Sequence, residues 1–204
     1  MLYLVDDMTD QVILQFSTTK NSISWRPPFF PNWASWLIRH MTHSPFSHVD
    51  IELPDGTLLG SSDSPKAKVL SGNPRGVAIR PADYEDYGSR FRMIIKTDKA
   101  DAIFAAAKSQ LGKPFDNAAL KGFLSDALPG ERDWGAADKW FCSELAVWAF
   151  LTAKYWDTIP GIWPKNRVSP SDILLIFLFD PNWTNRDTFW QGNPYPMRVK
   201  VRPL

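Results

Sequence analysis

The sequence predicts an α+β protein that folds as a single domain over residues 1–204. The main strand patterns come before the two strongest helical patterns, whereas regular alternation of strands and helices would have predicted a parallel α/β sheet. No repeat, Gly/Ser-rich linker or block of like charges divides the chain, and at 23.2 kDa it is long enough to bury a substantial core.

Strands are expected where apolar or β-branched residues form short runs or alternate with polar ones. The clearest case is the segment 46–53, in which His48, Asp50 and Glu52 share one face. Comparable patterns cover residues 12–17, 57–59, 77–80 and 91–95, and Val199 and Val201 suggest a closing strand.

The dipeptide Asp55-Gly56 predicts a tight hairpin between two of these strands. With a two-residue turn, Asp50 lies opposite Ser61 and His48 lies opposite Asp63, so that Ser61 and Asp63 share the face of the histidine. A one-residue bulge would reverse that face.

Helices are expected where apolar residues recur at a spacing of three and four positions. Such patterns cover residues 33–41, 98–111 and 142–155, and a short element over 169–179 opens with Ser-Pro-Ser-Asp. The segment 25–32 contains three prolines and is expected to be an irregular loop.

Charge and composition exclude several classes of function. Because 23 Lys and Arg residues are balanced by 22 Asp and Glu residues, we expect no broad basic surface and no nucleic-acid partner. The most apolar stretch, residues 173–179, is too short to span a bilayer, so we expect no stable membrane insertion. A smaller basic face, expected to be solvated, comprises Lys66, Lys68, Arg75 and Arg80.

The N-terminal sequence Met-Leu-Tyr-Leu-Val-Asp-Asp carries acids where a signal peptide carries Lys or Arg, so we expect synthesis in the cytoplasm. Association with a virion, or delivery by a dedicated apparatus, is compatible with the same observation. A single cysteine excludes an internal disulfide and a thiolate metal cage. No Walker loop, dinucleotide fingerprint or histidine-rich metal motif is present, and we expect no cofactor and no metal.

The single cysteine, Cys142, occupies a position that suits a nucleophile. The run Trp-Phe-Cys-Ser-Glu-Leu places it in the first turn of a predicted helix, where backbone N–H groups lack internal partners and the helix dipole is positive. Such a position favours a thiolate, and the N–H groups of Cys142 and Ser143 can hold an oxyanion. The alternative is a buried structural thiol that packs as a small apolar side chain.

A nucleophilic thiol requires a base, and the chain has three histidines. His40 falls within a predicted helix and His43 at its end, where packing and the helix dipole account for them. His48 lies on the polar face of a strand, and a strand imidazole that faces a helix N-terminus is an arrangement used by cysteine hydrolases. The alternative for His48 is an exposed strand residue.

These segments together resemble the circularly permuted papain-like hydrolases of the NlpC-type peptidase superfamily. That superfamily includes YiiX-like amidases and, more distantly, lecithin:retinol acyltransferase-like proteins. In it the histidine precedes the cysteine, as Ser47-His48-Val49 precedes Phe141–Leu145 here. The segment 112–116, Gly-Lys-Pro-Phe-Asp, resembles the family's Gly-Lys-x-Tyr-Asp turn, and Ser169–Ile173 resembles its Pro-containing segment after the cysteine helix.

The resemblance covers about residues 10–180 and implies a permuted papain-like fold. In that fold an antiparallel sheet packs against a helix that bears the nucleophile Cys142 at its N-terminus, and His48 is the general base. The family also places a polar residue on the strand after the histidine strand to orient the imidazole. That position here is Gly60, which has no side chain, so Asp50 is the first candidate for the role, with Ser61 and Asp63 behind it. A solvated strand face for Asp50, with a backbone carbonyl or water orienting the ring, is the alternative.

The implied function is a cysteine hydrolase that cleaves an amide bond in a peptide, isopeptide or cell-wall peptide through an acyl-enzyme. Its partner would be a peptide-like or acylated substrate, and the oligomeric state is left open. Two other functions stay open: a non-catalytic binding or structural module, which the departure at Gly60 favours, and a lipid acyl hydrolase or acyltransferase. Aromatic residues that flank the predicted site, and that we expect to be core rather than cleft, are Trp25, Phe29, Phe30, Trp33, Trp134 and Trp140.

Overall fold

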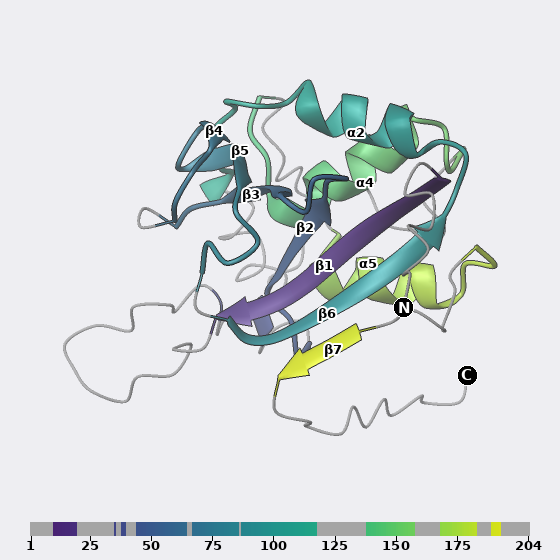
Figure 1. Cartoon of the computed structure of the whole chain (residues 1–204), viewed down its shortest axis with the longest axis horizontal. Helices are drawn as coiled ribbons and strands as arrows, with labels where there is room; N and C mark the ends of the chain where they lie inside the picture. The colour runs from purple at the N-terminus through teal and green to yellow at the C-terminus, as the bar shows by residue number, and fades with distance from the viewer. Residues whose placement is uncertain are drawn as a thin grey trace, which may run out of the picture.

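The computed structural model describes residues 10–19, 35, 38–39, 44–64, 67–85, 87–117, 138–157, 168–182 and 189–192. Within these residues, seven strands form one antiparallel sheet that is accompanied by three helices, and the predicted α+β class is confirmed (Figure 1). The strand order across the sheet is β4-β5-β3-β2-β1-β6-β7.

The strands are β1 Gln11–Thr19, β2 His48–Glu52, β3 Leu58–Ser62, β4 Ser71–Gly72, β5 Gly76–Arg80, β6 Tyr87–Lys96 and β7 Phe189–Gly192. The helices are α2 Ala100–Lys108, α4 Cys142–Thr152 and α5 Pro170–Leu178. All the predicted elements between residues 44 and 182 are present, whereas the short strand β4 and the strand β7 were not predicted. The proposed closing strand at Val199 and Val201 lies outside the described residues, as does most of the helix at 33–41.

The centre of the sheet is built on β1, which pairs antiparallel with both β2 and β6. Alternation along these strands sends one set of side chains into the core: Leu14 lies opposite Ile51 and Phe16 opposite Val49. The rings of Phe16, Phe46 and Phe91, all buried, lie 5.9 to 6.2 Å apart between centroids. The opposite side chains of β2, His48 and Asp50, are thereby directed to the other face of the sheet.

Helix α4 contacts β2 and β3, and it also contacts α2 and α5 (Figure 1). Its residues are apolar on almost every side, which is the pattern of a helix in the middle of a core. Phe150 is fully buried, and its ring centroid lies 5.0 to 5.3 Å from those of Tyr155, Trp156 and Phe177. Because Phe177 belongs to α5, this aromatic cluster joins the two helices.

The hairpin between β2 and β3 differs from the predicted two-residue turn. The N–H of Leu53 donates to the Thr57 carbonyl over 2.8 Å, so three residues form the loop, and Gly56 adopts a φ of 78°. The left-handed conformation of a glycine at this point inserts the bulge residue. The ladder pairs Ile51 with Leu59, and the same register places Asp50 opposite Gly60 rather than Ser61.

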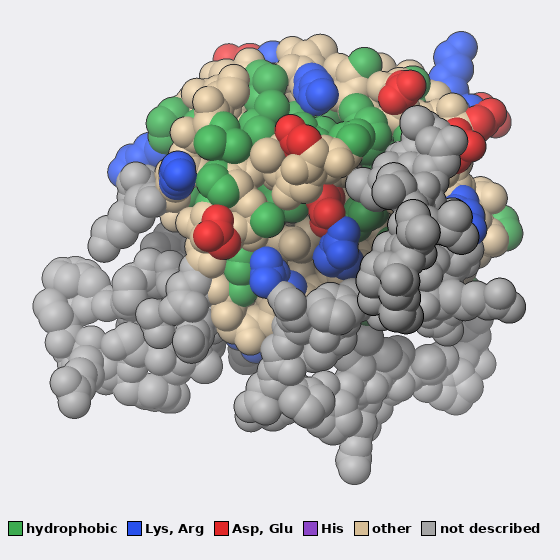
Figure 2. Space-filling view, viewed as in Figure 1, with side chains coloured by type: hydrophobic (Ala, Val, Ile, Leu, Met, Phe, Trp, Pro, Cys, Tyr) green, Lys and Arg blue, Asp and Glu red, His purple; other side chains and the backbone are tan. Residues whose placement is uncertain are grey.

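Charged side chains of both signs are interspersed with apolar and uncharged ones on the face of the molecule seen in Figure 2. Among the described residues, no helix has both the length and the apolar character needed to cross a membrane.

Candidate active site

The chain segment before Cys142 is attached to the sheet through the main chain of Trp140. The Ser61 hydroxyl donates to the Trp140 carbonyl oxygen over 2.6 Å, and the N–H of Asp116 donates to the same oxygen over 3.1 Å. The Trp140 N–H in turn donates to the Pro114 carbonyl over 3.1 Å. The Gly-Lys-Pro-Phe-Asp segment therefore lies beside the approach to the cysteine.

Cys142 is the first residue of α4, and Phe141 is its N-cap. The N–H groups of Cys142 and Ser143 lie in the first turn, and the described part of the chain provides no acceptor for them. The buried Ser143 hydroxyl donates to the Val168 carbonyl, and the Glu144 carboxylate accepts from the Phe141 N–H over 3.0 Å. These contacts fix the helix start, and two N–H groups are left that can stabilise an oxyanion near the sulfur.

His48 begins β2, and two side chains hold its ring. Asp50 Oδ1 lies 2.8 Å from His48 Nε2, and the Tyr84 hydroxyl oxygen lies 3.1 Å from the same nitrogen. The Tyr84 hydroxyl donates to Asp50 Oδ2 over 3.0 Å. The charge of Cys142 and a side-chain hydrogen bond to it also act on the His48 ring, so the cysteine side chain lies close to the imidazole.

The surroundings of His48 favour the charged imidazolium. Burial is the largest single influence and lowers the pKa of His48, but the charges of Asp50 and Cys142 and side-chain hydrogen bonds to both raise it well above the ordinary value of 6.5. A histidine with a raised folded-state pKa stabilises the fold while it is protonated. Its contribution is therefore complete below about pH 6.5 and is lost as the pH rises through the folded-state pKa.

Asp50 fills the space that Gly60 leaves empty. Its side chain is 1% exposed, which excludes the alternative of a solvated strand residue. A Cβ atom on Gly60 would lie only 1.9 Å from Asp50 Oδ1. The expectation that Ser61 and Asp63 share the histidine's face is wrong, because the extra turn residue shifts the register: Ser61 binds Trp140 on the other face, and Asp63 is exposed.

Tyr84 is a site residue that sequence reasoning missed. It lies between β5 and β6, where its N–H donates to the Pro81 carbonyl over 3.1 Å. Burial, and after it the charge of Asp50, raises the pKa of Tyr84 well above its ordinary value, so the hydroxyl stays protonated and donates to the carboxylate. The only sequence feature at Tyr84 is its place in the acidic run Asp-Tyr-Glu-Asp-Tyr, and this run does not indicate a contact with His48 or Asp50.

Arg80 contradicts the expected solvated basic face. It is 0% exposed, and its guanidinium donates to the Gly60 and Gly76 carbonyls over 3.0 Å each. Its Cζ atom lies 5.4 Å from the centroid of the Tyr84 ring. Strand alternation turns Arg80 inward beneath the tyrosine, whereas Lys68 and Arg75 are exposed and Lys66 lies outside the described residues.

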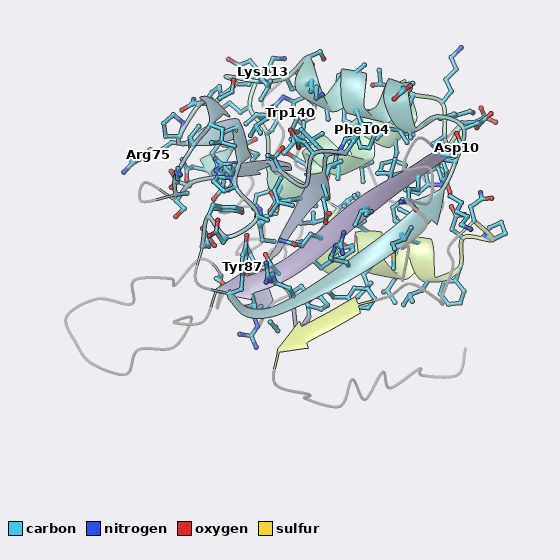
Figure 3. All side chains as sticks on the ribbon, in the orientation of Figure 1. Asp10, Arg75, Tyr87, Phe104, Lys113 and Trp140 are labelled. Atoms are coloured by element: carbon cyan, nitrogen blue, oxygen red, sulfur yellow. The ribbon has the colours of Figure 1, made fainter. Side chains whose placement is uncertain are left out.

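Several residues considered from sequence lie outside the described residues: His40, His43, Trp25, Phe29, Phe30, Trp33 and Trp134. Trp140 is described and is half-buried, with its ring centroid 5.2 Å from that of Trp148. Lys113 Nζ lies 5.8 Å from the Trp140 ring, and Figure 3 labels both residues. Trp140 is therefore packed at the site's edge.

Asp50→Asn is expected to lower the pKa of His48, because the substitution removes the negative charge that lies 2.8 Å from Nε2. The change should be about 1 to 3 pH units. An NMR titration of the imidazole signals, with His48 assigned through His48→Gln, measures it. Asp55→Asn, at an exposed turn, is the matched control and should leave the titration unchanged. An unchanged midpoint in Asp50→Asn would show that the carboxylate does not act on the ring.

Comparison with known proteins finds no family model and no curated protein that matches this chain. Within the described ranges, no group of three or more His, Cys, Asp and Glu side chains could hold a metal ion.

Proposed function

We propose that the protein is a cysteine hydrolase with a permuted papain-like fold, in which Cys142 is the nucleophile and His48 is the general acid and base. The observation that carries this proposal is the interaction of the helix-start cysteine with an imidazole that a buried carboxylate binds at Nε2. Nucleophile, base and orienting group in this order are the arrangement that covalent catalysis requires.

In the proposed reaction, the Cys142 thiolate attacks the carbonyl carbon of an amide, and the carbonyl π electrons move onto oxygen. The N–H groups of Cys142 and Ser143 stabilise that oxyanion. As the carbon–nitrogen bond breaks, a ring proton of His48 passes to the leaving nitrogen, and a thioester remains. Neutral His48 then takes a proton from water, whose oxygen attacks the thioester, and release of the carboxylic acid returns the thiolate and the imidazolium.

The substrate we propose is an amide in a peptide, an isopeptide or a cell-wall stem peptide; an ester or thioester would follow the same steps. The alternative of a non-catalytic module rested on the missing side chain at Gly60. That argument is weakened because the carboxylate of Asp50 stands where a side chain on Gly60 would begin. An envelope substrate would suit a protein that is virion-associated or delivered by a dedicated apparatus.

Trapping of an acyl-enzyme tests the proposal. The protein is incubated with a panel of peptides, isopeptides, cell-wall stem peptides and acyl lipids, quenched in acid, and examined by intact-mass spectrometry. We expect a single acyl adduct on wild-type protein, no adduct on Cys142→Ala, and a normal adduct on the turn variant Asp55→Asn. The acyl group that accumulates identifies the substrate class and separates an amidase from a lipid acyltransferase.

Absence of both adduct and cleavage across the whole panel, with protein that is folded by circular dichroism, would contradict the hydrolase and favour a binding module.

A further inference from the structure

The carboxylate of Asp50 occupies a site with converging donors. Oδ1 accepts from the ring nitrogen Nε2 of His48, and Oδ2 accepts from the Tyr84 hydroxyl. Both of these side chains are buried, with Asp50 1% and Tyr84 8% exposed. Two donors directed at the two oxygens fix the carboxylate's position as well as its charge.

Two backbone positions reach this carboxylate site. Asp50 reaches it from β2, and the Cβ direction of Gly60 on β3 enters it directly, 1.9 Å from Oδ1 and 3.0 Å from the Asp50 carboxyl carbon. The backbone of Gly60 is held by its pairing with Ala78 and by the Arg80 guanidinium, which donates to the Gly60 carbonyl over 3.0 Å. Because Gly60 does not have a positive φ, its backbone conformation is open to residues with a side chain.

Residue 60 therefore has no side chain for a steric reason: the Asp50 carboxylate occupies the space that a side chain there would need. Any side chain at residue 60 competes with the Asp50 carboxylate for one volume, and only one of the two positions can carry the group. The hydrogen-bond donors around that volume, from His48 and Tyr84, do not depend on which strand supplies the acceptor.

We propose that Gly60 is a positioning residue for His48: it keeps open one carboxylate site that β2 or β3 can fill, and here Asp50 fills it. The inference rests on the proposed role of His48 in catalysis. The new element is that the orientation and charge of the imidazole depend on where the carboxylate lies in space, and that either β2 or β3 can supply the carboxylate.

The decisive experiment moves the carboxylate. Asp50→Gly should lower the midpoint of the His48 imidazole titration by about 1 to 3 pH units. Adding Gly60→Asp to that variant should return the midpoint to within about half a pH unit of wild type, because the opposite charge is again beside the ring. Alkylation of Cys142 by iodoacetamide at pH 6 should be lost in Asp50→Gly and regained when Gly60→Asp is added. A folded double variant whose midpoint stays at the Asp50→Gly value would overturn the proposal.

A double-mutant cycle with Gly60→Ala tests the proposal if the Asp50→Gly, Gly60→Asp double variant does not fold. Gly60→Ala should displace the carboxylate and lower the His48 midpoint when Asp50 is present, and should have no effect when residue 50 is glycine. Equal effects of Gly60→Ala in both backgrounds would refute the proposal.

These readouts need no substrate. If the double variant restores the His48 titration but the wild-type protein forms no acyl adduct on any substrate, the carboxylate site is supported and the hydrolase is rejected. If the wild-type protein forms an acyl adduct but the double variant does not restore the titration, the hydrolase is supported and the carboxylate site is rejected.

Discussion

Replacement of His48 by alanine is expected to slow the alkylation of Cys142 by iodoacetamide at pH 6 by on the order of 100-fold. In the wild-type protein the raised pKa of His48 keeps the ring charged at this pH, and an adjacent imidazolium favours the reactive thiolate. Free cysteine, with a pKa near 8.5, is less than about 1% thiolate at pH 6 and sets the slow reference rate for this comparison.

The reaction can be followed by intact mass, and because the chain has a single cysteine the added group reports on Cys142 alone. Asp55→Asn, at an exposed turn, is the control and should react at the wild-type rate. Cys142 is 2% exposed, so a thiol that only packs in the core would react no faster than free cysteine whether or not His48 is present. Equal rates in wild type and His48→Ala would therefore remove the basis for a catalytic pair.

The second large effect is on stability. Phe150→Ala should reduce the free energy of unfolding by about 3 to 5 kcal/mol, because it removes a fully buried ring and leaves a cavity between α4 and α5. Urea denaturation followed by circular dichroism measures the loss. The same aromatic cluster holds α4, the helix that begins at Cys142, so weakening the cluster also loosens the position of Cys142.

Phe179→Ala provides the control, since that side chain is 86% exposed and its loss should change the free energy of unfolding by no more than about 0.5 kcal/mol. Should Phe150→Ala fail to fold, Phe150→Leu keeps the comparison quantitative, with a smaller expected loss than the alanine variant. Similar losses for Phe150 and Phe179 variants would contradict the assignment of the core.

The residues of the candidate site that the sequence singled out each carry a local signature. Cys142 stands at the start of a helical pattern, and His48 and Asp50 share one face of an alternating strand. These inferences require only neighbours a few residues apart.

The remaining members of the cluster carry no such signature. Tyr84 reaches His48 across 36 residues of sequence, and Ser61 reaches the Trp140 carbonyl across 79. Arg80 looks like a surface residue in any local window, because nothing nearby in the chain shows that strand alternation turns it beneath Tyr84. The predicted hairpin register was wrong for a related reason. An Asp-Gly pair is compatible with loops of two and of three residues, and only the backbone conformation of Gly56 distinguishes the two loop lengths.

Local chemistry along the chain was thus enough to specify an α+β protein with one cysteine at a helix start and one histidine beside a carboxylate. Long-range packing decided the rest: which residue faces Gly60, which hydroxyl binds the carboxylate, and that the arginine is buried. The physical reason is that side-chain period and helix capping depend on adjacent residues, whereas register and burial depend on which distant surfaces meet in the folded molecule.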